Sequence, residues 1–356
     1  MTNVQKLVGG IIMIKKKLGV LLTFIVTISI MVGCVDETGQ HVSEKTDAVE
    51  EAKEKGYSQE TEDYSISFTT GVETGTLYPL GAIMSEFWSK ELPNIQATSG
   101  ASNGSTQNLN FLSEKEAEVG LTMGNVLVEA YDGEGDFNGK PYKDLRVLAG
   151  LHPNYDYVIV RKGSGIETIE DLKGHDFVPG ATGSGTEKVS NMILDAHGLS
   201  FDDVNASFVG FGEATELMRN KQIDGTIISS GIPASAVTEA LTTADGKLIS
   251  IDDEKRDKLV EENSFYVKSV IPKGTYDGQD EDIQTTSLQN ILVADASMPD
   301  DVAYDLVKSF WENQEEMEGS HGVFESIDIE NVDMGIGEVP FHPGAEKYYQ
   351  EQDLLE

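Results

Sequence analysis

Three segments rich in glycine and hydroxyl-bearing residues are the parts of this sequence best suited to chemistry. They read TGVETGTLY over residues 70–78, SGASNGSTQN over residues 99–108 and GSGT over residues 183–186. Glycine lets the backbone approach a ligand closely, and hydroxyls supply hydrogen bonds without a fixed charge. Each segment alone fits an ordinary turn followed by a helix N-cap. The three together, drawn from both halves of the chain, favour one shared binding site.

The second segment also contains a motif that serine hydrolases use. GASNG, residues 100–104, fits G-x-S-x-G, which places a nucleophilic serine on a sharp turn between a strand and a helix. A hydrolase would also need an acid and a histidine late in the chain, and His342 is available. Because the motif is short and the chain contains 36 glycines, we expect no enzymatic activity. A serine hydrolase that uses Ser102 remains the alternative.

The residue types give little support to metal or nucleotide chemistry. Cys34 is the only cysteine, which excludes a disulfide within the monomer and a cysteine-rich metal site. GATGSGT, residues 180–186, is not a P-loop, because Thr186 stands where the motif requires lysine. We therefore expect no cofactor and no bound metal.

The three segments lie in a chain whose strand and helix patterns alternate. Residues 66–69 alternate like a strand, and a helical stripe then appears at Leu80, Ile83, Met84, Phe87 and Trp88. Further features are strands at residues 119–123, 145–151 and 155–161, a helix capping box at 168–171, and Pro233 in the first turn of a helix. This alternation predicts an α/β protein with mostly parallel sheets. Ligands of such sheets bind beyond the carboxyl ends of the strands, where the three polar segments lie.

The N-terminus has the pattern of a secretory signal. Three lysines at residues 15–17 precede the uncharged run LGVLLTFIVTISIMVG, which ends directly before Cys34. The run has 16 residues, fewer than the roughly 20 that a membrane-spanning helix needs. MVGC, residues 31–34, resembles a bacterial lipobox, which implies cleavage before Cys34 and attachment of a lipid to its sulfur. Residues 34–62 are polar and acidic, so we expect a flexible tether.

The charge of the chain excludes some partners. The formal net charge is −36, from 62 acidic and 26 basic residues. Such a surface repels nucleic acids and anionic lipid headgroups, so we expect no nucleic-acid partner and membrane attachment only through the lipid. The acidity fits either a solvated surface or adaptation to a saline or alkaline exterior.

A series of motifs in order resembles one known family. The series is FTTGVETGTLYPLG, GSTQNL, EAEVGLTMGN, EDLKG, GATGSGTE, QIDGTIISSGIP, IPKGTYDGQDED and HPGAEKYYQE. Over residues 63–356 it is similar to the TAXI family, the solute receptors of one branch of the tripartite ATP-independent periplasmic (TRAP) transporters. The resemblance implies a type II periplasmic-binding-protein fold, with two α/β lobes joined by crossing strands and a ligand in the cleft. It also implies a small carboxylate ligand, such as glutamate, a dicarboxylate or 2-oxoglutarate.

The resemblance also implies which residues bind the ligand. From the three polar segments these are Thr70, Gly71, Thr76, Tyr78, Ser105, Thr106, Asn108, Gly183, Ser184 and Thr186. Asn125, at the end of a strand, and the turn containing Gly231 and Pro233 complete the set. The family often has an acid at the position of Asn125, so this chain lacks a negative charge there, which would favour an anion.

These observations together predict the organisation of the protein. A lipoprotein signal occupies residues 1–33 and the tether residues 34–62, while residues 63–160 with 256–356 form lobe 1 and residues 161–255 form lobe 2. We expect an extracytoplasmic, lipid-anchored monomer that closes its lobes over the solute and delivers it to the membrane subunits of a TRAP transporter. A sensory or adhesion lipoprotein on the same fold is a further alternative.

Overall fold

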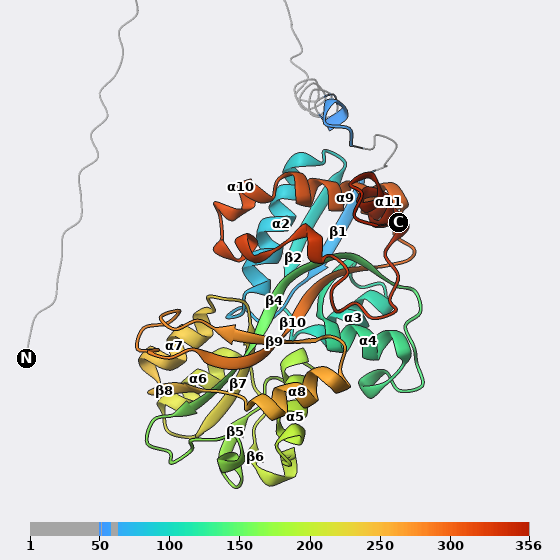
Figure 1. The fold of residues 1–356 in the computed structure, drawn as a ribbon. Coiled ribbons are helices and arrows are strands. Elements are labelled where there is room, and N and C mark those ends of the chain that lie inside the picture. Colours follow the sequence, from blue (N-terminus) through green and yellow to red (C-terminus); the bar gives the residue numbers. More distant parts are fainter. Residues whose placement is uncertain (1–49, 51, 58–62, 356) are drawn as a thin grey trace, which may run out of the picture. The chain divides into compact units, whose positions relative to one another are not determined.

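The computed structural model describes residue 50, residues 52–57 and residues 63–355 (Figure 1). The predicted signal, the predicted lipid site at Cys34 and most of the predicted tether lie outside the described residues. The tether segment that is described packs on the fold, since Ala52 and Tyr57 are only 4% and 5% exposed in the core. The prediction of a flexible tether rested on the polar composition of residues 34–62, and these two apolar side chains are exceptions to that composition. Among the described residues, no helix is both long and apolar enough to cross a bilayer.

A single ten-stranded sheet runs through the described residues, with the strand order β2-β1-β3-β10-β4-β7-β5-β6. The strands in that order are β2 (Ile95–Gly100), β1 (Tyr64–Thr69), β3 (Val119–Met123), β10 (Ile283–Asp295), β4 (Leu145–Arg161), β7 (Gly225–Ser230), β5 (Asp176–Val178) and β6 (Asn205–Ala206). Off this path, β8 (Gly246–Ile249) pairs with β4, and β9 (Tyr266–Ile271) pairs with β10. The outer strands at each end are parallel, whereas β4 and β10 run antiparallel to each other and to their neighbours.

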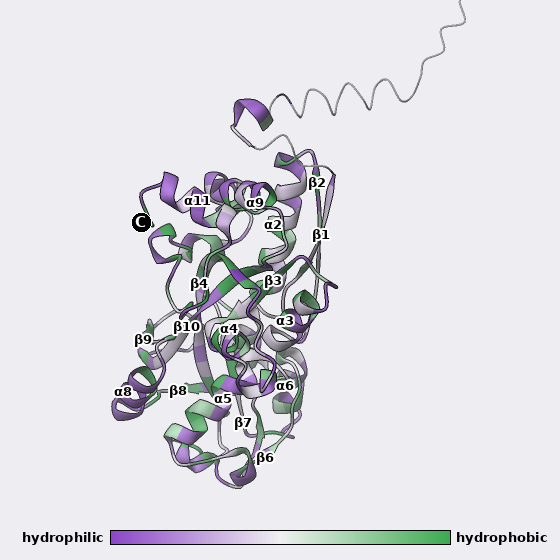
Figure 2. Cartoon of the chain, turned by 90° about the vertical axis from the view of Figure 1, so that its right-hand side faces the viewer, coloured by the Kyte–Doolittle hydropathy of each residue, from purple (hydrophilic) through white to green (hydrophobic). Residues whose placement is uncertain are grey.

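Helices cover the sheet, and the first six of those given next each follow a strand that has a parallel partner. They are α2 (Leu77–Glu91), α3 (Ser105–Ser113), α4 (Gly124–Asp132), α5 (Gly185–Ala196), α6 (Phe211–Arg219), α7 (Ser235–Thr243), α8 (Asp253–Glu262), α9 (Asp300–Glu312), α10 (Gln314–Glu318) and α11 (Pro343–Glu351). The apolar stripe predicted from Leu80 to Trp88 forms the inner face of α2, where both residues are fully buried. Figure 2 shows hydrophilic residues gathered on α8, a helix whose buried residues are only Arg256 and Leu259.

The hydrophobic core divides into two regions on either side of the crossing strands. We use lobe 1 for the elements around the two clusters that contain Trp88 and Leu127, and lobe 2 for those around the clusters that contain Ile193 and Ile228. Residues 256–288, which the sequence analysis assigned to lobe 1, pack with lobe 2 through side chains such as Leu259 and Tyr276. The boundary therefore falls within β10, because this strand contributes to the cores of both lobes. That the lobes move as separate bodies stays a prediction.

Two local predictions were wrong. Residues 145–151 and 155–161 form one strand, β4, because the pairing with β10 continues through Pro153 with a register irregularity. Pro233 does not lie in a helix; its peptide bond with Ile232 is cis, and α7 begins two residues later. The first difference depends on pairing between segments far apart in the sequence, which local patterns do not contain.

Candidate functional site

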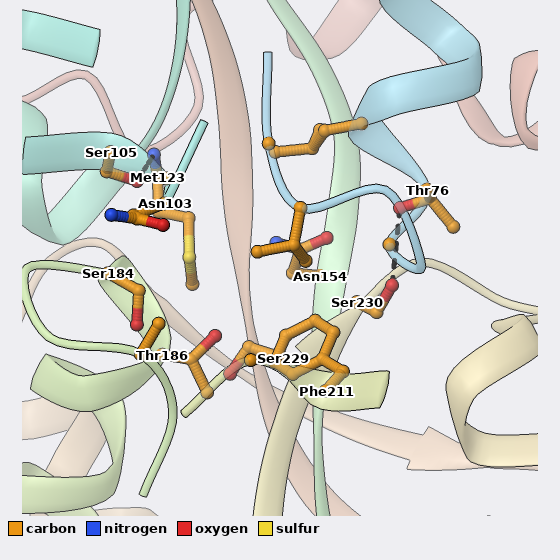
Figure 3. Close-up of a pocket in the computed structure, with 18 residues that line it drawn as sticks. Thr76, Asn103, Ser105, Met123, Asn154, Ser184, Thr186, Phe211, Ser229 and Ser230 are labelled. Atoms are coloured by element: carbon orange, nitrogen blue, oxygen red, sulfur yellow. Dashed lines mark hydrogen bonds between the residues drawn. The ribbon is translucent and has the colours of Figure 1, made fainter. Parts of the chain in front are cut away.

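A cavity lies where the two lobes meet beside β4 and β10. It encloses about 490 Å³ of atom-free space, part of which is open to solvent. The cavity is lined by Gly71, Val72, Gly75, Thr76, Leu77, Asn103, Gly104, Ser105, Met123, Asn154, Ala181, Ser184, Gly185, Thr186, Gly210, Phe211, Ser229 and Ser230. Figure 3 shows these side chains arranged around a common space, with Ser105 and Met123 from one lobe facing Ser184 and Thr186 from the other.

Five helices begin at this cavity. Their N-cap residues are Thr76 on α2, Gly104 on α3, Met123 on α4, Ser184 on α5 and Gly210 on α6, and all five line it. The first backbone N–H groups of a helix have no partner within it, and each helix N-terminus carries a partial positive charge of about half a unit. Each of these helices follows a strand or the loop after it, which is why their starts meet at one edge of the sheet. The arrangement concentrates positive potential on the cavity.

The side chains that line the cavity carry no formal charge. The described lining consists of glycines, hydroxyls, two asparagines and apolar residues such as Val72 and Phe211. An anion bound here would be held by backbone N–H groups, hydroxyls and amides. The lining likewise offers no carboxylate to pair with an ammonium group.

A hydrogen-bonded cluster joins the lobes at one side of the cavity. The Thr76 hydroxyl lies 3.3 Å from that of Ser230 and accepts a hydrogen bond from the backbone N–H of Gly231. His152 Nε2 lies 3.2 Å from the Thr76 hydroxyl, and burial lowers the pKa of this imidazole to about 3. His152 is therefore neutral at physiological pH and adds no charge beside the cavity.

Asn154 and Asn290 join the crossing strands next to this cluster. Their side-chain amides donate to each other, at 2.7 and 3.0 Å. Both residues are almost fully buried, and Asn154 also faces the cavity. The pair links β4 and β10 at their register irregularity, with Asn154 at the cavity.

Five of the residues predicted to bind the ligand line the cavity. They are Gly71, Thr76, Ser105, Ser184 and Thr186. Ser184 also caps α5, because its hydroxyl accepts the backbone N–H of Glu187 at 3.1 Å. The Ser105 hydroxyl accepts the N–H of Met123, so it also connects the starts of α3 and α4.

The other predicted residues lie outside the lining. Asn108 is fully buried and donates to the carbonyls of Thr70 and Leu121, which makes it a support for the strand ends. The remaining ones lie behind the cavity or beside it, namely Thr70, Thr106, Asn125, Gly183, Gly231, Tyr78 and Pro233. Several of these connect the lobes, since Asn125 donates to the carbonyl of Gly185, and the carbonyl of Gly183 accepts from the N–H of Thr106.

The sequence analysis missed several residues that line the cavity. Asn154 lies within β4, Ser229 and Ser230 end β7, and Phe211 begins α6. A search at the carboxyl ends of all predicted strands would have found the two serines. Asn154 gives no such signal, because it lies in the middle of a long strand.

The arrangement required by the alternative serine hydrolase is not present among the described residues. The Ser102 hydroxyl accepts the backbone N–H of Gly104. His342 is fully buried at the start of α11, where its Nδ1 accepts from Gly344 and its Nε2 contacts the carbonyl of Met298. The Ser102 hydroxyl and the His342 imidazole are therefore both hydrogen-bonded to backbone groups.

Comparison with known proteins assigns the family. The model of the NMT1-like family matches residues 68–352, which include all the residues that line the cavity. The chain belongs to the NMT1-like family. The matched residues include both lobes of this NMT1-like protein and the crossing strands between them.

Solved structures of other proteins resemble the fold of this chain. A protein from Bordetella bronchiseptica RB50 matches with a TM-score of 0.51 at 19% sequence identity, over 81% of this chain and 82% of that one. The alkanesulfonate-binding protein SsuA from Xanthomonas axonopodis pv. citri, bound to MOPS, gives a TM-score of 0.49 at 13% identity, over 83% and 96% of the two chains. The fold of this NMT1-like protein is the mixed α/β fold of type II periplasmic binding proteins, as predicted.

Proposed function

We propose that this protein is an extracytoplasmic solute-binding protein of a membrane transporter and that it captures a small organic anion. The observation that carries the proposal is the convergence of five helix N-termini on one uncharged cavity between two lobes. Backbone N–H groups at helix starts bind carboxylates and similar anions without a basic side chain. The lobes would close over the solute by a hinge at β4 and β10 and present the closed form to membrane subunits.

Within the anions, we propose a carboxylate without an amino group, such as a dicarboxylate or 2-oxoglutarate. Glutamate was the other predicted ligand, but its ammonium group would meet no carboxylate among the lining residues. Leaving a buried charge unpaired costs several kcal/mol. The apolar side chains of Val72, Leu77 and Phe211 suit the carbon chain of such an acid.

The test is a calorimetry and thermal-shift screen on protein that has been unfolded and refolded to remove carried-over ligand. The panel is succinate, malate, fumarate, 2-oxoglutarate, glutamate, glutamine and a short alkanesulfonate. Saturable binding of one carboxylate without an amine would support the proposal. Preference for the sulfonate would support a receptor for organic anions but contradict the proposal that the ligand is a carboxylate. Binding of glutamine alone would contradict the proposal that the ligand carries a net negative charge.

We further propose that the transporter is of the TRAP type. The support is the ordered series of motifs that resembles the TAXI receptors. Vesicles containing TRAP membrane subunits should take up the solute only when this protein and an ion gradient are both present. Uptake that instead requires ATP would contradict the TRAP assignment and leave the receptor function unaffected.

Lipid anchoring at Cys34 belongs to the same proposal and rests on the lipobox-like MVGC at residues 31–34. Cells fed a labelled fatty acid should incorporate it into the wild-type protein and not into Cys34→Ser. Label retained by the variant would contradict the anchor.

A further inference from the structure

A second cluster of polar side chains lies in lobe 2, apart from the cavity. Glu170 begins a short 3-10 helix (Glu170–Leu172), His197 caps the C-terminus of α5, and Asp252 caps the N-terminus of α8. One ligand-type atom from each of the three side chains lies within 4.8 Å of the other two. The start of α5 lines the cavity, and the 12 residues of this helix place His197 roughly 18 Å away at its other end.

The imidazole of His197 is oriented as in many metal sites. His197 is 7% exposed, and its Nδ1 donates to the carbonyl of Ile193 at 2.7 Å. Because a carbonyl can only accept, the proton is on Nδ1, and Nε2 keeps a free lone pair. Histidines that bind metals usually donate their other ring nitrogen to a backbone carbonyl or a carboxylate in this way.

The two carboxylates of the cluster have no basic partner among the described residues. Three cations on neighbouring elements are paired with other acids: Arg256 with Asp253, Lys173 with Asp203, and Lys258 with Asp195. Lys255 on α8 lies within 4 Å of neither carboxylate of the cluster. Two carboxylates this close repel each other, and a bound cation would remove that repulsion. An imidazole nitrogen within 4.8 Å of both carboxylates indicates a cation that accepts both nitrogen and oxygen ligands.

We propose that Glu170, His197 and Asp252 bind a divalent transition-metal ion, with Zn²⁺ as the preferred ion. One imidazole and two carboxylates suit Zn²⁺ or Mn²⁺, whereas Ca²⁺ and Mg²⁺ are bound almost entirely by oxygen. The centre of three atoms at most 4.8 Å apart lies no more than about 2.8 Å from each of them. Shifts of less than about 1 Å by the exposed Glu170 and Asp252 side chains would reach zinc–ligand distances of about 2.0–2.2 Å.

The ion would connect three elements of lobe 2 that lie far apart in the sequence. The first turn of α8, the last turn of α5 and the short helix at residues 170–172 would all be tied to it. Because α5 also supplies Ser184 and Thr186 to the cavity, the ion would hold the far end of a ligand-binding helix. The inference is independent of the identity of the solute.

The test uses the full protein after treatment with a chelator and dialysis. Titration calorimetry with ZnCl₂ should show one equivalent bound and a raised melting temperature, with MgCl₂ and CaCl₂ at least tenfold weaker. Glu170→Gln and Asp252→Asn, both at exposed positions, should each lower the zinc affinity at least tenfold. His197→Asn, which keeps a donor for the Ile193 carbonyl, should lower it further.

Asp195→Asn is the matched control, because Asp195 is an exposed carboxylate on the same helix that lies outside the cluster. It should leave the zinc affinity unchanged. Absence of zinc binding, or zinc binding that survives Glu170→Gln and Asp252→Asn at full affinity, would overturn the proposal. Co²⁺ gives a separate readout, since binding at the cluster should change the visible d–d absorption bands of this ion, and His197→Asn should abolish that change.

Discussion

The hydroxyl of Ser229, which faces the cavity, donates a 2.6 Å hydrogen bond to the carboxyl group of Asp156. Asp156 lies on β4, is 1% exposed and also accepts the hydroxyl of Thr286 at 2.7 Å. Burial raises the pKa of this carboxyl group to about 7, although both hydroxyl donors act in the opposite direction. A titratable group is thus buried directly behind the lining of the binding site.

The raised pKa of Asp156 predicts a pH dependence of stability. Between about pH 4 and pH 7 the folded state holds a proton on Asp156 that the unfolded state has released, so the free energy of unfolding should fall as the pH rises through this window. A carboxyl pKa raised to about 7 changes the free energy of unfolding by on the order of 4 kcal/mol across this window. Urea unfolding at several pH values should show a flatter dependence for Asp156→Asn than for the wild type.

The exposed carboxylate of Asp277 provides the control for this comparison. Asp277→Asn should retain the wild-type pH dependence. Identical slopes for Asp156→Asn and the wild type would show that Asp156 does not titrate in this window.

Gly185 should be needed for closure of the cleft. A side chain at this first residue of α5 would overlap Met123 Sδ and come within 3.0 Å of the Ser105 hydroxyl, both of which belong to the facing side of the cavity. Gly185→Val should therefore lower ligand affinity at least tenfold while the unliganded protein keeps its melting temperature, because separated lobes avoid the overlap.

Gly81→Ala is the contrasting variant, since its methyl group would overlap Thr70 Cγ2 inside lobe 1. It should lower the free energy of unfolding by about 1–3 kcal/mol whether or not ligand is present. A Gly185→Val protein that is equally destabilised without ligand would contradict the explanation through closure. Thermal unfolding and calorimetry of both variants make the comparison.

Lys188 on α5 forms ion pairs with the facing side of the cleft. Its Nζ lies 2.9 Å from Asp136 and 3.7 Å from Glu129, which belong to the α4 region. Partly exposed pairs contribute about 0.2–1 kcal/mol, so Lys188→Met should weaken ligand binding by up to about fivefold, less at high salt. Lys143→Met, which removes a pair with Asp132 within lobe 1, should leave affinity unchanged.

Asp136→Asn separates two explanations for an effect of Lys188. If the ion pair stabilises the closed form, this substitution should also weaken binding. If Lys188 only attracts the anion through its charge, removing a nearby negative charge should strengthen binding. Calorimetry at two salt concentrations distinguishes these outcomes.

The hydroxyl of Thr186 should donate a hydrogen bond directly to the bound anion. Thr186 lines the cavity at 3% exposure in the first turn of α5. A hydrogen bond to a charged group contributes about 1.5–3 kcal/mol, so Thr186→Val should weaken anion binding by at least tenfold. Thr186→Ser keeps the hydroxyl and should bind the anion like the wild type. Equal affinities of the wild type, Thr186→Val and Thr186→Ser would show that the hydroxyl makes no hydrogen bond to the ligand.

The sequence by itself determined the features that depend on neighbouring residues. The stripe from Leu80 to Trp88 predicted the buried face of α2, and GSGT at residues 183–186 fitted a turn followed by a helix N-cap, because both patterns act within one or two helical turns. The alternation of such elements was sufficient for the α/β class, and the glycine-rich segments pointed to the edge of the sheet where the cavity lies.

Only the tertiary structure decided which side chains meet. Asn154 reaches the cavity because β4 crosses between the lobes, and Asp156 lies behind Ser229 because β4 pairs with β7. Likewise, no local pattern relates Glu170, His197 and Asp252, and the sequence analysis expected no metal; the three are brought together by the packing of α5 and α8. Packing between distant segments is a property of the whole core, so contacts of this kind leave no short-range signal in the chain.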